Sequence, residues 1–70
     1  MTTKDLLLRQ TADFYCSNNA RVAISMKGGE ILEGIVIDVE SEELRFNDHK
    51  QGSMRIDFKK IDSINHIGSS

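Results

Sequence analysis

The chain has 70 residues, a formal net charge of −2 and a pI of about 5.5. A domain this short buries only about 60% of its unfolded surface, so it usually relies on disulfides, a metal or oligomerisation. Cys16 is the only cysteine, and His49 and His66 are the only histidines, so the usual ligands of a closed zinc site are missing. The composition therefore predicts one domain with no metal and no cofactor, and it favours oligomerisation.

The charge balance and the hydropathy narrow the class of protein further. Nucleic-acid-binding proteins usually carry a basic surface because phosphate contacts dominate affinity, so RNA binding by this acidic chain would need a local basic patch. The sequence has no apolar run long enough for a transmembrane helix or a secretory signal. With its single cysteine, the chain is expected in the reducing cytoplasm, without a membrane partner.

The first predicted element is an amphipathic helix over about residues 3–16. Thr2 or Thr3 can cap its start, and Asp5 suits the first turn. Its apolar face has spacings of three and four and comprises Leu7, Leu8, Thr11, Ala12 and Tyr15. The segment 17–19 is expected to end the helix, since Ser and Asn bond their own backbone in turns.

A long bent strand is predicted at the centre of the chain. After an alternating strand that begins at Arg21, Gly28 and Gly29 are expected to supply the positive φ angles of a tight hairpin. Gly34 interrupts the next strand, over 30–40, and a glycine inside a strand commonly marks a sharp bend. The nearly continuous apolar run over 35–39 predicts burial on both faces, one of them against a neighbouring subunit.

Three shorter strands complete the predicted sheet. They are centred on Leu44 and Phe46, on residues 54–58, and on residues 61–67, with a polar loop over 47–53. The fold class is therefore mainly β: an N-terminal helix followed by a five-stranded, strongly bent antiparallel small barrel. We expect a single domain over 1–70, with the barrel over about 21–67 and a frayed tail over 68–70.

This pattern resembles the Sm-like family of small barrels, which includes the Sm, LSm and Hfq-like proteins. The resemblance covers nearly the whole chain. Its first motif is matched by Ile24, Met26, Lys27, Gly29, Gly34, Val36 and Val39. Glu40 stands where the family often has an aspartate, and the apolar positions of the second motif fall within 54–64.

The resemblance implies a homomeric ring of roughly five to seven subunits, in which the fourth strand of one subunit pairs with the fifth strand of the next. The open edges of a five-stranded bent sheet and its small core favour such an assembly independently. The residues expected at the subunit interface are Met54, Ile56, Phe58, Ile61 and Ile64.

The resemblance also implies RNA binding at the ring pore. It places Lys59 and Lys60 in a loop near the pore, where repetition around a ring would create a circle of positive charge; a solvated turn is the alternative. The full set of candidate RNA-binding cations is Lys59, Lys60, Arg55 and Lys50. However, the segment 41–44 has two carboxylates and no aromatic ring on which a base could stack.

A second function class therefore stays open, namely an acidic small barrel that binds a protein of the transcription or RNA machinery. The segment 26–38 is similar to that of the Rho-binding antiterminators, and a basic partner would suit the acidic residues Glu30, Glu33, Asp38, Glu40, Glu42 and Glu43. A purely structural ring is a third reading. No enzyme is predicted: Glu42 and Glu43 point to opposite faces of a strand, and Cys16 has no activating base. The three phenylalanines, Phe14, Phe46 and Phe58, are expected in the core or an interface.

Overall fold

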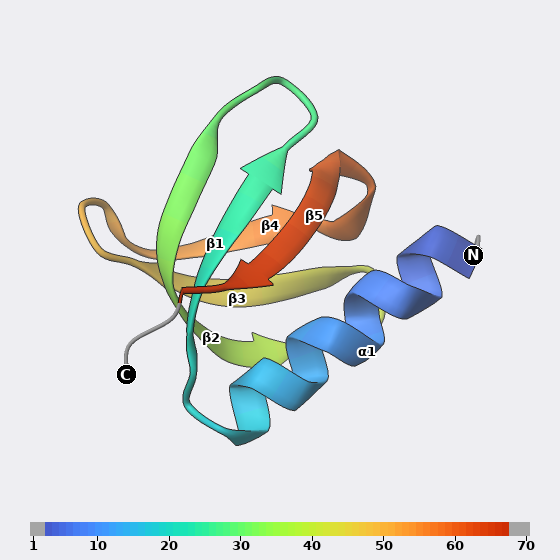
Figure 1. Ribbon diagram of the computed structural model, residues 1–70, viewed down its shortest axis with the longest axis horizontal. Helices are drawn as coiled ribbons and strands as arrows, with labels where there is room; N and C mark the ends of the chain where they lie inside the picture. Colours follow the sequence, from blue (N-terminus) through green and yellow to red (C-terminus); the bar gives the residue numbers. More distant parts are fainter. Residues whose placement is uncertain (1–2, 68–70) are drawn as a thin grey trace.

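The computed structural model describes residues 3–67 of the chain. Its elements are α1 (Thr3–Ser17), β1 (Arg21–Met26), β2 (Ile31–Val39), β3 (Glu43–Asp48), β4 (Gly52–Asp57), the 3₁₀ turn η1 (Phe58–Lys60) and β5 (Ile61–His66). The strands form one antiparallel sheet in the order β4-β3-β2-β1-β5, which curves around the core, and α1 runs along one end of it (Figure 1). This arrangement confirms the predicted fold class. The alternative cap Thr2 and the tail over 68–70 lie outside the described residues.

The end of α1 follows from its asparagines. Asn19 has a φ of 52°, in the left-handed region that asparagine tolerates better than most residues. Its N–H donates to the Cys16 carbonyl at 3.2 Å, and the next N–H, of Ala20, donates to the Tyr15 carbonyl at 3.0 Å. These two bonds form a Schellman motif, which satisfies carbonyls at the end of the helix. The predicted stop at 17–19 is confirmed.

The buried face of α1 is narrower than predicted. Leu8 and Ala12 are buried, and Tyr15 is half-buried against a stacked His66 ring at 5.8 Å between centroids. Leu7, which the spacing assigned to this face, is 58% exposed. The prediction for Leu7 is wrong because the sheet covers only the side of the helix centred on Leu8 and Ala12.

The hairpin between β1 and β2 needs only one left-handed glycine. The Met26 N–H donates to the Glu30 carbonyl at 2.7 Å, and the Gly29 N–H donates to the Met26 carbonyl at 2.9 Å. Gly29 has a φ of +96°, whereas Gly28 does not adopt a positive φ. The loop thus has three residues with a single left-handed position, a common hairpin class. The expectation of a positive φ at Gly28 is wrong.

Gly34 lets β2 lie close to β3. It is paired with Val22 on one side and with Asp48 on the other. A Cβ at Gly34 would overlap the carbonyl oxygen of Asn47 and would lie 2.9 Å from the carbonyl carbon. Since that obstacle is backbone, it cannot rotate away. The prediction that the bend depends on Gly34 therefore has a direct steric basis.

Burial alternates along the second half of β2. Val36 is 1% exposed, but Ile35 and Ile37 are 38% and 45% exposed. Ile37 is an extra residue in the β2–β3 ladder, because the register shifts between Val36 and Asp38. The predicted burial of both faces is not found within the chain, since α1 covers the inner face alone.

The core lies between the inner face of the sheet and α1. Its buried apolar residues are Leu8, Ala12, Val22, Ile24, Leu32, Val36, Leu44, Phe46, Ile56, Phe58, Ile61 and Ile64. Phe46 and Phe58 are in this core as expected, but Phe14 is 64% exposed and contacts the Tyr15 ring edge-on at 5.6 Å. Over residues 3–67, no helix is long and apolar enough to cross a membrane.

Candidate functional site

A small hollow of about 120 Å³ lies where α1, the β2–β3 turn and η1 meet. We call it the helix-end hollow; its lining residues are Asp5, Ser41, Glu42, Asp57, Phe58 and Lys59. The Phe58 N–H donates to the Glu42 carbonyl at 3.0 Å and thereby ties η1 to the β2–β3 turn. The fold thus brings Lys59 next to the segment 41–44, as the Sm-like resemblance implied.

The local structure around Lys59 depends on an aspartate. The carboxylate of Asp57 caps η1, since its Oδ1 accepts a hydrogen bond from the Lys59 N–H at 2.9 Å. Lys59 and Lys60 are both exposed on this short turn. The helix-end hollow therefore contains three carboxylates and a single ammonium group, a charge balance that disfavours phosphate on its own.

A wider groove of about 340 Å³ lies beside β4. It contains two of the other candidate cations, Arg55 and Lys60, together with three carboxylates and an apolar floor of Met26, Leu32, Met54 and Ile56. Arg55 forms an ion pair of 3.6 Å with Glu43, and both side chains are partly or largely exposed. An exposed pair of this kind contributes little to stability.

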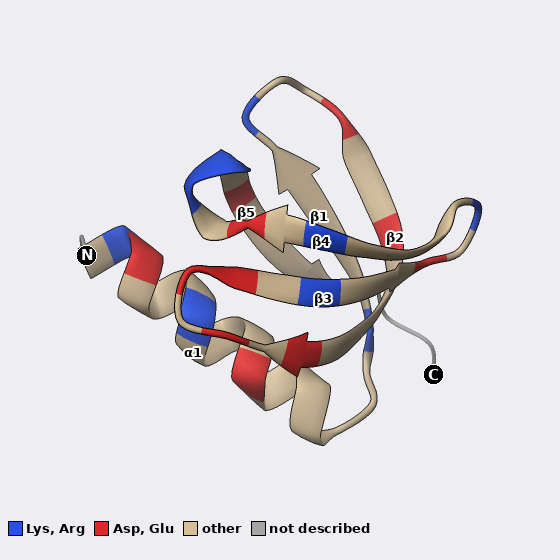
Figure 2. Ribbon diagram, turned by 180° about the vertical axis from the view of Figure 1, so that it is seen from behind, with Lys and Arg blue, Asp and Glu red and all other residues tan. Residues whose placement is uncertain are grey.

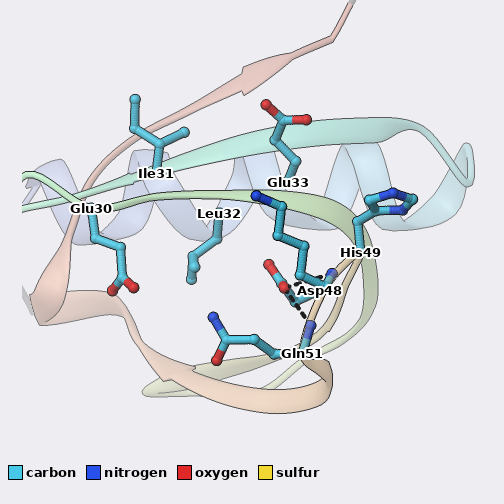
Figure 3. Close-up of a pocket in the computed structure, with 8 residues that line it drawn as sticks. Glu30, Ile31, Leu32, Glu33, Asp48, His49 and Gln51 are labelled. Atoms are coloured by element: carbon cyan, nitrogen blue, oxygen red, sulfur yellow. Dashed lines mark hydrogen bonds between the residues drawn. The ribbon is translucent and has the colours of Figure 1, made fainter.

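The last candidate cation, Lys50, is at the tip of the β3–β4 hairpin, at the other end of β4 from Lys59. It lines a third hollow, of about 300 Å³, into which Glu30, Leu32 and Gln51 are directed (Figure 3). The carboxylate of Asp48, 5% exposed, accepts hydrogen bonds from the Lys50 and Gln51 N–H groups at 2.9 and 2.7 Å. Asp48 is thus a structural residue of the turn.

The four predicted RNA-binding cations therefore do not form one patch. Lys59 lies in the helix-end hollow, Arg55 and Lys60 lie along β4, and Lys50 is at the hairpin tip. In each place carboxylates are among the neighbouring residues. Sequence reasoning did not find the Asp48 turn, although an aspartate beside a polar hairpin loop is a typical signal of one.

The residues predicted at the subunit interface lie mostly in the core of the chain and not on its surface. Ile56, Phe58, Ile61 and Ile64 are at most 7% exposed and belong to the core of their own chain, while Met54 is half-buried. Their side chains are thus already covered. β4 and β5 are nevertheless the two outer strands of the sheet, so a neighbour could still pair with their main chains.

The part of the chain that the structure describes has no cluster of metal ligands, and its cysteine is held in the thiol form. Among residues 3–67, no group of three or more His, Cys, Asp or Glu side chains is placed to hold a metal ion. The Cys16 thiol donates a hydrogen bond to the Ile37 carbonyl at 3.4 Å. Burial raises the pKa of this thiol, and the negative charges of Asp38 and Asp13 add to the increase, so the reactive thiolate is disfavoured.

Comparisons with known proteins support the fold alone. No protein-family model matches the chain, and no curated protein matches its sequence. Among solved structures, the chain is similar to the 1.55 Å crystal structure of Hfq, described as a pleiotropic translational regulator. The TM-score is 0.74 and the identity 12%, with 84% of this chain and 97% of that chain covered. The chain therefore has the Sm-like fold, with a divergent sequence.

Proposed function

We propose that the chain is a non-catalytic, RNA-associated regulator of the cytoplasm that assembles into a homomeric Sm-like ring. The observation that carries this proposal is the exposed Lys59-Lys60 pair on η1, of which Lys59 lies beside the β2–β3 turn. The structural neighbour is itself a translational regulator. The open β4 and β5 edges supply the unpaired main-chain groups that a ring would satisfy.

In such a ring, the positive charge of the η1 lysines would be repeated once in every subunit. Two lysines from every subunit would face a common opening and hold phosphates, while base recognition would be poor because no aromatic ring lines the helix-end hollow apart from the buried Phe58. We therefore expect low sequence specificity and a strong dependence of affinity on salt.

RNA affinity measured against salt concentration tests this function. We expect binding of a single-stranded oligonucleotide at low salt, and loss of about 0.7 from the slope of log K against log salt for each lysine removed. The variant Lys59→Ala/Lys60→Ala should show this loss. Lys50→Ala, at the other end of β4, is the matched control and should not. Absence of binding at low salt, or an equal loss in both variants, would refute the pore-lysine proposal.

The oligomeric state needs its own measurement. Native mass spectrometry and light scattering should find a closed homo-oligomer. A chain that stays monomeric at micromolar concentration would contradict the ring.

The three carboxylates of the helix-end hollow favour a second candidate function, the binding of a basic protein segment. The substitution Glu42→Gln separates the two functions because it removes one negative charge from this hollow. If the hollow binds RNA, the variant should bind RNA more tightly, since a repulsive charge is gone. If it binds a basic segment, the variant should bind a lysine- and arginine-rich peptide more weakly and leave RNA affinity unchanged.

A further inference from the structure

On the outer face of β3 and β4, directly opposite residues of the two strands carry charges of the same sign. The β3–β4 register places Arg45 directly opposite Arg55, and it places Glu43 directly opposite Asp57. We call the first pair the arginine row and the second the acidic row. Two adjacent blue bands on β3 and β4 mark the arginine row, and the acidic row lies in the red segments to the left of these bands (Figure 2).

This arrangement is unfavourable within one chain. Like charges directly opposite each other on a sheet are destabilising, whereas opposite charges in the same positions would attract. The chain relieves part of the repulsion through the diagonal ion pair between Arg55 and Glu43 at 3.6 Å, and through Asp38, which lies opposite Arg45 on β2. Arg45 forms no ion pair with any residue of the described range 3–67. Two rows of opposite sign thus lie side by side on an exposed face.

We propose that this face binds a second copy of the chain, with the arginine row of each copy against the acidic row of the other. A two-fold axis that runs parallel to the rows and between them produces this match, because it exchanges their positions along the strands. Arg45 then faces Glu43 of the second copy, and Arg55 faces Asp57. Sheets pack about 10 Å apart, a distance that arginine and carboxylate side chains can bridge together.

A second copy fits the local charge better than a polyanion does. Asp38 is directly opposite Arg45 on its other side, so the surroundings of the two arginines include three carboxylates, of Asp38, Glu43 and Asp57. A phosphate backbone would meet a net negative surface there. The exposed Ile37 beside Asp38, 45% exposed, adds apolar area at the margin of this face.

The face contact is separate from edge pairing between β4 and β5, because pairing at strand edges leaves the faces of a sheet free. If the chain forms rings, the face contact joins one ring to another, and if it does not, the contact produces a dimer. Edge pairing through main-chain hydrogen bonds should persist in salt, whereas the face contact should weaken.

Complementary charge variants test the proposal. The acidic variant, Arg45→Glu/Arg55→Glu, makes both rows negative; the basic variant, Glu43→Lys/Asp57→Asn, makes the second row positive and keeps an η1 cap. We expect each variant alone to self-associate at least about tenfold more weakly than the native chain, and their equimolar mixture to recover the association. Sedimentation velocity at low and high salt measures all three, and circular dichroism confirms that the variants are folded.

Lys50→Glu is the control, because it reverses an exposed charge outside both rows and should leave the association unchanged. The proposal is overturned if the acidic variant associates like the native chain, or if the mixture associates no better than its components. It is also overturned if heparin binds the native chain and dissociates the pair, but does not bind the acidic variant, because the arginine row would then be an anion site.

Discussion

The two faces of the β3–β4 hairpin differ in how well their neighbouring side chains match. On the inner face Leu44, Phe46 and Ile56 are at most 4% exposed and continue one apolar core. On the outer face Arg45 is opposite Arg55 and Glu43 is opposite Asp57, so directly paired residues of β3 and β4 repel each other. The inner face stabilises the folded single chain, whereas the like-charge pairs of the outer face oppose folding.

This difference separates features that depend on the sequence of one strand from features that depend on how two strands are paired. The inner face follows from alternation along each strand, which needs no knowledge of the neighbouring strand. The outer pairs depend on register, which is a relation between two segments and is set by the length of the hairpin loop. Residues that stabilise the fold and residues that face a partner are thus encoded in different ways.

The largest expected effect is on the bend of β2, which positions both faces. Gly34→Ala should lower the free energy of unfolding by at least about 4 kcal/mol, in the range of the most severe single substitutions. Its Cβ overlaps the Asn47 backbone, so β2 and β3 must separate. Since a domain of this size has only about 3–5 kcal/mol in total, we expect an unfolded chain by circular dichroism and urea titration.

Gly28→Ala is the control for this substitution. A Cβ at Gly28 meets no atom within 4 Å, and the residue has no positive φ, so the variant should be as stable as the native chain. Gly29→Ala should fall between the two, with a loss of about 1 kcal/mol from its φ of +96°. A folded Gly34→Ala chain would show that the bend does not require close approach of the backbones.

These glycines also show how far the sequence predicts the fold. Gly34 was recognisable because a glycine inside an apolar strand usually marks a bend, and the helix, the strands and their inner face were predictable from periodicity. Gly28 was assigned wrongly, because two adjacent glycines do not reveal which of them is left-handed. The exposure of Leu7 and Phe14 could not be predicted either, since it depends on how α1 is rotated against the sheet.

The candidate site was less predictable than the fold. Lys59 near the segment 41–44 was expected from the resemblance, and the structure brings them together in the helix-end hollow. The contribution of Asp5 to this hollow, and the distance of Lys50 from it, depend on tertiary contacts that no local pattern contains. The arginine row required the register of β3 and β4, which the loop over 47–53 did not reveal.

The next effect in size contrasts a buried ring with an exposed one. Phe46→Leu should lower the free energy of unfolding by roughly 2 kcal/mol, about half the loss typical of Phe→Ala in a core, because Phe46 is completely buried. Phe14→Leu should change it by less than about 0.5 kcal/mol, since Phe14 is 64% exposed. Urea titrations at one protein concentration measure both, and similar losses would indicate that Phe14 is covered in solution.

A smaller loss is expected at the hairpin that joins the two strands. Asp48→Ala removes the acceptor for two N–H groups and should lower the free energy of unfolding by about 1–2 kcal/mol. Asp57→Ala, which removes one acceptor at an exposed turn, should cost about half as much. Equal losses in the same urea titration would mean that water replaces the buried carboxylate of Asp48 as readily as the exposed one of Asp57.

The smallest effect has the opposite sign and tests the outer face directly. Arg45→Thr removes the repulsion from Arg55, loses an attraction to Asp38 that forms no ion pair, and places a β-branched residue on β3. It should therefore raise the free energy of unfolding of the isolated chain by about 0.2–1 kcal/mol. Asn47→Thr makes the same change of strand propensity next to the row without altering its charge. The difference between the two variants, measured at high salt and at low salt, isolates the electrostatic part, which should shrink as salt screens the repulsion. If Arg45→Thr instead destabilises the isolated chain, the arginine row contributes to folding and the contrast between the two faces is wrong. A stabilising result means that folding of the single chain does not account for an arginine at this position, as expected if the arginine row serves an intermolecular contact.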